Sequence, residues 1–450
     1  MTADRRSRRR NTVLALVAAV LALIATGAMG AFAVVEMADS RAGQDASDDT
    51  GRVAEAQELP WTATALIGVM GDDGRMASSV VAVLTPDGRG GTIVPVSSSA
   101  DTASGTDVVL RPLGAVFDVD GPEAWRAAAE QITGLSFDVA EVVDQDRFIS
   151  IIGPLGDLPT LFPFAFTDAA SGETFEAGET VLSTAAAFRA ITAVNGDGPD
   201  WVLDPARNAV WDAIADRVGA GIGALPDGVA FTRAAPPVGL AQFSDALFSA
   251  PLTFRGLETV QIDPERVDDQ MPTDYSSVLG LGWEESVVTL RRGEVVLVFG
   301  SVAPARMAAP LEGPTVRMVS GYTDDDAEPF GLNRSDLLIG AIDVLLFTKT
   351  NVLSVVDQPG TTVPERTTVL VSDAALIDGV WELYGDVFGE LDVRVAPVAI
   401  AGIDLEITLG REYLRRLAES PDEDVTDEDV TDEIGPGTGP ETTDVAGSDS

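Results

Sequence analysis

Any chemistry in this chain must be built from carboxylates, hydroxyls and arginines, because its 450 residues include neither histidine nor cysteine. This composition excludes histidine general bases, thiolate nucleophiles and zinc sites that need imidazole or sulfur. A site that handles phosphate or sugar would use arginine forks, acidic metal ligands and hydroxyl groups instead. The 72 acidic and 29 basic side chains give a net charge of −43, which repels nucleic acid and argues against a DNA-binding role.

Three local clusters could be mistaken for functional sites. Asp324-Asp325-Asp326 lacks the ligand spacing of an EF-hand or a helical metal site, which favours a solvated turn over a Ca²⁺ site. Ser97-Ser98-Ser99 has no candidate base nearby in sequence and no G-x-S-x-G motif, which favours a strand-to-loop connection over a nucleophile. Gly219 to Gly223 follows a predicted helix rather than a strand, which argues against a dinucleotide-binding loop.

The segments that would position a site alternate between strand and helix patterns. Ser79–Leu84 and Gly91–Val96 are predicted to be neighbouring strands, and Pro95 favours an edge position for the second. Downstream, the pattern predicts a strand over Phe137–Val143 and helices over Gly121–Thr133, Arg147–Ile152 and Pro205–Val218. Such alternation predicts a layered α/β domain.

The strand and helix patterns begin again at Pro314 and predict a second, smaller α/β unit of about a hundred residues. Its predicted strands are 315–319, 352–356, 367–371, 392–395 and 404–409, and its predicted helices are 337–347 and 374–388. The stretch between the two units contains strand-like pieces, such as Val287–Leu290 and Glu294–Phe299, but no recognisable motif.

The N-terminus has the pattern of an export signal. Five arginines between Arg5 and Arg10 precede an uncharged stretch from Asn11 to Val35, and acidic residues follow it. At about 1.5 Å per residue this stretch spans the roughly 30 Å core of a bilayer, with the N-terminus inside. The small residues of Ala31-Phe32-Ala33 leave a cleaved signal peptide as the alternative. Either interpretation places the rest of the chain outside the cytoplasm.

The predicted organisation follows from these patterns. The acidic linker and the acidic tail contain few large apolar residues, which is typical of solvated chain. We expect a basic cytoplasmic segment at 1–11, a transmembrane helix at 12–35, an acidic linker at 36–60, an α/β domain at 61–240, an unassigned strand-containing connection at 241–313, a small α/β domain at 314–416 and a disordered acidic tail at 417–450.

Several segments resemble the LytR-CpsA-Psr (LCP) family of cell-envelope proteins, followed by a LytR C-terminal type of domain. The resemblance covers about residues 66 to 220 and about residues 314 to 413. The segments that carry it are Arg75–Pro86, Ile132–Asp138, Val142–Asp144, Phe148–Leu158, Val316–Gly321 and Asp404–Gly410. Each motif is degenerate, and the order and spacing of the motifs make the resemblance specific. It implies a layered α/β/α domain followed by a small α/β domain.

The resemblance also implies an activity. Family members resemble phosphotransferases that move a polyprenyl-diphosphate-linked glycopolymer onto peptidoglycan, using arginines to hold the diphosphate and an acidic residue with Mg²⁺. Matched to this chain, the acidic residue is Asp101, whose neighbouring arginine in the family is replaced by Ala100. A family aspartate that follows Arg75 is replaced by Ala77. Asp101 therefore has a competing interpretation as a turn residue.

The remaining family arginines are only partly matched. The segment that matches the family's Arg-x-Arg has no arginine at the matching positions. Arg189, which lies slightly further along the chain, is the only residue there that could substitute for them. The family's Asp-x-x-Arg-x-x-Arg-Gln keeps Asp204 and Arg207, but its second Arg-Gln is replaced by Val210 and Trp211. Removing one preorganised donor typically costs about 3–4 kcal/mol of transition-state stabilisation, so several losses leave little catalysis.

Two functions remain open at this point. In the first, an anchored LCP-like protein has lost transferase activity and acts as a binding or scaffolding partner, with polyprenyl-phosphate lipid, peptidoglycan or other envelope proteins as possible partners. In the second, it remains a phosphotransferase with a rebuilt site that uses Asp101 as the catalytic acid, Arg75, Arg189 and Arg207 for substrate binding, and Mg²⁺. The second function predicts that these four residues converge on one cavity.

Overall fold

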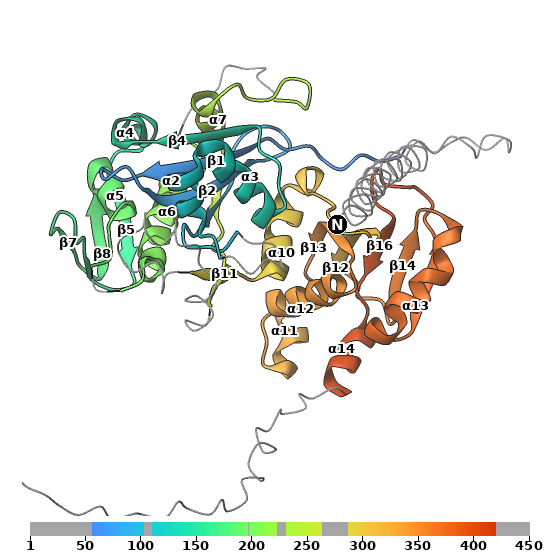
Figure 1. The fold of residues 1–450 in the computed structure, drawn as a ribbon. Coiled ribbons are helices and arrows are strands. Elements are labelled where there is room, and N and C mark those ends of the chain that lie inside the picture. Colours follow the sequence, from blue (N-terminus) through green and yellow to red (C-terminus); the bar gives the residue numbers. More distant parts are fainter. Residues whose placement is uncertain (1–55, 103–109, 197, 223–230, 263–286, 420–450) are drawn as a thin grey trace, which may run out of the picture.

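The computed structural model describes residues 56–102, 110–196, 198–222, 231–262 and 287–419 (Figure 1). The predicted basic segment, transmembrane helix and nearly all of the acidic linker and tail lie outside these ranges. Among the described residues, no helix combines the length and apolarity needed to cross a bilayer.

The first sheet has five strands in the order β4-β1-β2-β3-β9. Its strands are β1 (Thr64–Met70), β2 (Met76–Leu84), β3 (Gly91–Val96), β4 (Val139–Val143) and β9 (Leu252–Phe254). β2 pairs antiparallel with β1 and β3, whereas β1 with β4 and β3 with β9 are parallel pairs. The mixed sheet with its helices confirms the predicted α/β class.

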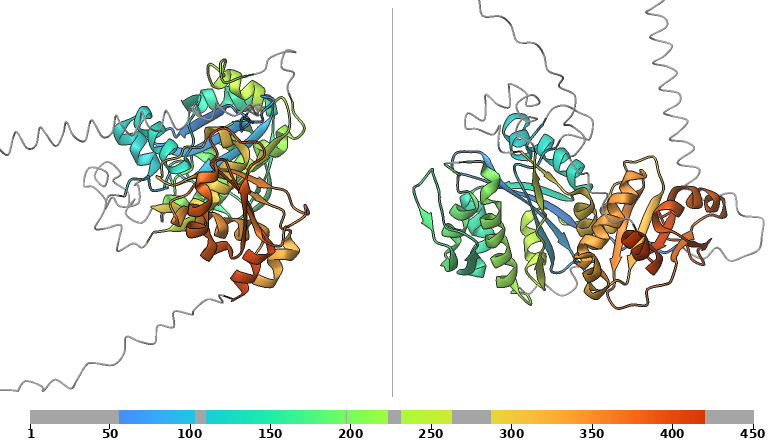
Figure 2. Two further views of the ribbon diagram at one scale, coloured as in Figure 1. Left: turned by 90° about the vertical axis from the view of Figure 1, so that its right-hand side faces the viewer. Right: turned by 90° about the horizontal axis from the view of Figure 1, so that it is seen from below.

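Helices cover both faces of this sheet because successive strand residues point to opposite sides. Val80 and Ala82 join the core formed with α4 (Gln145–Ile152), α5 (Thr184–Ile191), α6 (Asp204–Val218) and α7 (Leu240–Leu247). Val81 and Val83 join the opposite core, which includes side chains of α2 (Leu113–Asp120) and α3 (Pro122–Thr133). The views in Figure 2 show these helices on the two sides of the sheet. The first unit therefore has three layers.

The second sheet has the order β13-β12-β16-β14-β15, with β14 and β16 as its antiparallel pair. Its strands are β12 (Thr315–Ser320), β13 (Asn351–Asp357), β14 (Thr367–Val371), β15 (Leu391–Val395) and β16 (Leu405–Thr408). α11 (Asp324–Ala327), α12 (Arg334–Phe347), α13 (Ile377–Phe388) and α14 (Arg411–Glu419) accompany it. Val316, Met318, Val369 and Ile407 form one core with these helices.

Three two-stranded ribbons complete the described fold. They are β5 (Leu158–Phe162) with β8 (Gly178–Leu182), β6 (Phe166–Thr167) with β7 (Thr174–Phe175), and β10 (Thr259–Gln261) with β11 (Val288–Leu290).

The predicted strand-like piece at Glu294–Phe299 is wrong, because these residues lie in helix α10 (Arg292–Val302). Val295 and Phe299 pack into a core of the first unit, whereas Val296 packs into the core of the second. The helix lies between the two units (Figure 1) and is therefore apolar on two sides. An apolar run without one polar face cannot be told from a buried strand by periodicity.

The predicted edge position is wrong for β3 as a whole, but Pro95 itself lies in a part of β3 that has a neighbouring strand on one side only. β3 runs between β2 and β9, but β9 pairs only with Gly91 to Ile93. Pro95 therefore lies past the end of β9, where its missing N–H removes no hydrogen bond from the sheet. The three serines that follow β3 form the predicted connection from strand to loop.

Candidate functional site

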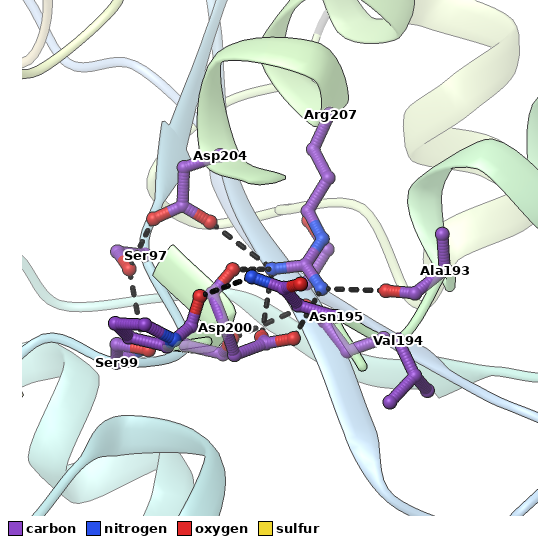
Figure 3. Close-up of polar contacts among 12 residues, drawn as sticks. Ser97, Ser99, Ala193, Val194, Asn195, Asp200, Asp204 and Arg207 are labelled. Atoms are coloured by element: carbon purple, nitrogen blue, oxygen red, sulfur yellow. Dashed lines mark hydrogen bonds and ion pairs between the residues drawn. The ribbon is translucent and has the colours of Figure 1, made fainter. Parts of the chain in front are cut away.

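A network of polar side chains lies where the turn after β3 meets the start of α6. A cavity of about 260 Å³ opens there. Ser97 and Asp204 both line it, and the Ser97 hydroxyl donates a 2.5 Å hydrogen bond to Asp204 Oδ2 (Figure 3). The other residues that line the cavity are Ser78, Pro95, Val96, Ser98, Pro205, Arg207, Asn208, Leu257, Glu258, Thr259 and Leu290.

The guanidinium of Arg207 is saturated by partners within the chain. Its Nη1 donates to Asp200 Oδ2 at 2.8 Å and to Asp204 Oδ1 at 3.1 Å. Its Nη2 donates to Asp200 Oδ1 and to the carbonyl of Ala193, both at 2.9 Å. Its Nε donates to the carbonyl of Ile191 at 3.1 Å. All five N–H groups of the fork are therefore used, and none is left to bind a ligand.

This arrangement follows from the local sequence. A 3-10 turn over Asp200–Leu203 runs directly into α6. Asp200, Asp204 and Arg207 therefore lie on the same side of this helical segment, about one turn apart. The side chain of Arg207 is only 4% exposed. A buried arginine of this kind needs compensating acceptors, and the two carboxylates and two carbonyls supply them.

The pKa values of the pair reflect burial and coupling. Burial raises the pKa of Asp204 to about 6, although Arg207 and the Ser97 hydrogen bond both oppose the rise. Burial alone would lower the pKa of Arg207, but Asp200 and Asp204 outweigh it and raise that pKa. Arg207 therefore stays charged, whereas Asp204 titrates close to neutral pH.

The N-terminus of α6 is partly satisfied by the chain itself, because the backbone N–H of Asp204 donates to the carbonyl of Trp201. Helix N-termini commonly bind anions because their first N–H groups are free. Here Asp204 places a carboxylate in the first turn, and Pro205 has no N–H to offer. The start of α6 therefore places the carboxylate of Asp204 at the cavity.

Trp211 stands where the family pattern has a glutamine, and it is part of the core. Its side chain is 4% exposed, its Nε1 donates to Ser78 Oγ at 3.3 Å, and its ring meets Phe148 edge-on at 6.2 Å. It also borders a separate apolar cavity of about 30 Å³. Other residues that line this cavity include Ile67, Val80, Ile93, Phe243 and Leu247. A space of this size holds about one water molecule.

Asp101 lies at a different cavity. Its backbone N–H donates to the carbonyl of Val288 at 2.8 Å, and its carboxylate accepts the N–H of Arg111 at 2.9 Å. It lines a cavity of about 360 Å³ between the two units, together with Gln131 and Asn351. Asp101 thus has the contacts of a residue that holds a turn together.

The other two predicted arginines each pair with an acid outside the Ser97 cavity. Arg75 Nε lies 3.9 Å from Asp118 Oδ2, and burial is the main cause of the raised pKa of Asp118. Arg189 forms a two-point ion pair with Glu173 near the surface. Of the four predicted site residues, only Arg207 is among the residues that line the Ser97 cavity.

The residues present do not fit the magnesium ion that the resemblance implies. In the part of the chain that the structure describes, no group of three or more acidic residues could hold a metal. Asp200 and Asp204 instead hold Arg207. The acidic cluster at Asp324 forms the first turn of α11, where Asp326 completes a capping box with Thr323.

None of Ser97, Asp200, Asp204 and Asn208 was a candidate site residue from the sequence, although Asp204 matches the family pattern and Ser97 belongs to the serine cluster considered above. The spacing of Asp204 and Arg207 at i and i+3 near a helix start was visible, and it signals an ion pair. The contact between Ser97 and Asp204 joins positions 107 residues apart, so no local pattern could indicate it.

Comparisons with known proteins found similarity only at the level of structure. No family profile matches the chain, and no curated protein matches it. B. subtilis TagV is similar over 49% of this chain and 95% of its own, with 16% identity and a TM-score of 0.34. B. subtilis TagT is similar over 57% of this chain and 91% of its own, with 12% identity and a TM-score of 0.34. The structure of TagT bound to LIIa-WTA is similar over 52% of this chain and 97% of the TagT chain, with 10% identity and a TM-score of 0.32. At these identities and TM-scores, the similarities assign no family or activity.

Proposed function

We propose that this chain is a membrane-anchored, extracytoplasmic LCP-like protein of the cell envelope that acts as a binding or scaffolding partner in cell-wall glycopolymer assembly without transferring the polymer. The order of the sequence supports this proposal: an export signal, an α/β domain that resembles the LCP family and a second small α/β unit. In this proposal residues 12–35 anchor the protein, and the described units lie outside the cytoplasm.

The observation that carries the proposal is the saturation of Arg207. A phosphotransferase of this kind needs guanidinium donors that are free to neutralise a diphosphate as charge develops on it. Arg207, one of the two arginines retained from the family pattern, uses all five N–H groups to bind Asp200, Asp204 and two carbonyls. Redirecting it to a substrate would leave two carboxylates without their partner in a largely buried place, which is costly.

The apolar cavity supports the same conclusion. A polyprenyl chain needs a long apolar channel, whereas the cavity bordered by Trp211 and Phe148 has a volume of only about 30 Å³. Because these side chains are closely packed, a lipid would enter only by displacing part of the core.

The alternative function, an active phosphotransferase, would need Asp101 and the three predicted arginines around one substrate. Asp101 borders the cavity between the units, and Arg189 is paired with Glu173. This arrangement favours binding without transfer.

A transfer assay on the full chain in membranes tests the proposal. The assay supplies a polyprenyl-diphosphate-linked glycopolymer, Mg²⁺ and peptidoglycan, with an active LCP protein as positive control. We expect no transfer above the protein-free blank. We also expect the full chain to remain on isolated cell walls in a sedimentation assay.

Two variants make the assay decisive. Asp101→Ala tests the predicted catalytic acid, and Asp325→Ala is the matched control at an exposed acid of α11. Transfer that Asp101→Ala abolishes and Asp325→Ala preserves would overturn the proposal.

A further inference from the structure

We propose that the Ser97–Asp204 cavity binds a single uncharged, hydroxyl-rich sugar ring of a cell-wall polysaccharide. This inference rests on the proposed function and deepens it by naming the ligand class. It depends on three features of the cavity: its charge, the remaining hydrogen-bonding capacity of Asp204 and Asn208, and its apolar lining residues.

The charge of the cavity disfavours phosphate. Asp204 lines the wall with a side chain that is 14% exposed, and Glu258 is exposed at the same cavity. The positive charge of Arg207 is already shared between two carboxylates. The start of α6 adds no free anion site, because Pro205 and Asp204 occupy its first turn. A diphosphate would therefore meet net negative charge without a free cationic donor.

The hydrogen-bonding groups of the cavity suit hydroxyls. Asn208 lies one turn after Asp204 on α6, and no hydrogen bond to its side-chain amide is found among the described residues. An amide offers two donors and one acceptor, and a carboxylate accepts from hydroxyl groups. Asp204 and Asn208 together can therefore bind adjacent hydroxyls of a ring, which act as both donors and acceptors.

Part of the lining is apolar. Pro95, Leu257 and Leu290 border the same cavity. A sugar ring has polar edges and C–H faces, so it matches a site with one polar and one apolar side better than an ion does. The volume of about 260 Å³ is just below the roughly 300 Å³ of the smallest drug-sized pockets, which limits occupancy to about one ring.

Titration calorimetry on the full chain in detergent micelles tests the inference. The probes are an N-acetylglucosamine oligomer, a neutral hexose oligomer and inorganic diphosphate. We expect at least one sugar oligomer to bind and diphosphate not to bind. The two sugar probes distinguish a peptidoglycan-type ring from a ring of a neutral wall polymer.

Two variants locate the binding. Asn208→Ala removes the amide and should weaken sugar binding about tenfold, as expected for the loss of about 1.4 kcal/mol of hydrogen bonding. Leu257→Ala removes part of the apolar wall and should weaken binding by a similar factor. Gln131→Ala, the matched control in the cavity between the units, should bind like the wild type.

The inference fails if neither sugar binds, if sugar binding survives both cavity variants, or if diphosphate binds and Asn208→Ala weakens it. The first two results leave the proposed function standing, since that function is judged by transfer and wall retention. Glycopolymer transfer by the wild type would instead overturn the proposed function, whatever the sugars do.

Discussion

Two arginines on consecutive helices show how differently one residue type can be used. Arg207 on α6 is 4% exposed and uses every N–H of its guanidinium within the chain. Arg189 on α5 is 38% exposed and pairs with Glu173. Both positions were predicted as substrate-binding from the sequence. An arginine that matches the family pattern can therefore hold a diphosphate only if the residues around it leave some of its N–H groups free.

The largest expected effect comes from Arg207→Ala. Removing this guanidinium leaves Asp200 and Asp204 without their partner and two buried carbonyls without a donor. Breaking a buried pair in this way costs about 3–5 kcal/mol of unfolding free energy. Urea denaturation followed by circular dichroism measures the loss.

A conservative variant at the same position sharpens the result. Arg207→Lys keeps the charge but loses the planar fork, so it should be intermediate in stability. A stability of Arg207→Ala equal to that of the wild type would show that the network contributes little.

The second expected effect is a pH dependence that belongs to Asp204. Its pKa of about 6 exceeds the ordinary 3.8, so between these values the folded state holds a proton that the unfolded state releases. Wild-type stability should therefore rise relative to Asp204→Asn as the pH falls from 7 to 4. A shift of two pKa units corresponds to about 3 kcal/mol.

The measurement is the difference in unfolding free energy between wild type and Asp204→Asn at several pH values. Taking the difference cancels the titration of the other acids. The difference should begin to rise near pH 6 and level off near pH 4, with half of the change reached at about pH 5. A flat difference from pH 4 to 7 would mean that the pKa of Asp204 is the same in the folded and the unfolded state, which would contradict the prediction.

Much of the fold could be predicted because several elements carry their own signals. The helix α3 has Pro122 in its first turn and ends at Gly134, which adopts the left-handed conformation with φ of 69°. α6 places Val210, Ile214 and Val218 in the core. α10 could not be predicted because it packs against both units. It therefore lacks the polar face that would give its sequence a helical pattern of apolar and polar residues.

The site was harder to predict than the fold. Local spacing indicates the Asp204 and Arg207 pair, but the saturation of Arg207 depends on carbonyls of Ile191 and Ala193 supplied by another segment. The partner of Ser97 lies across the fold, on α6. Such contacts follow from tertiary packing, which a single sequence does not display.

Arg189→Ala is expected to change the unfolding free energy least. It tests how much the more exposed of the two arginines contributes to stability. Arg189 and Glu173 are both more than a third exposed, so solvent screens their attraction and their side chains lose entropy in pairing. We expect a loss below about 1 kcal/mol, which shrinks further in high salt. Urea denaturation at low and high ionic strength measures it, with Glu173→Gln as the matched partner variant. A loss as large as that of Arg207→Ala would erase the distinction between the two arginines, because exposure would then not decide how much a guanidinium contributes.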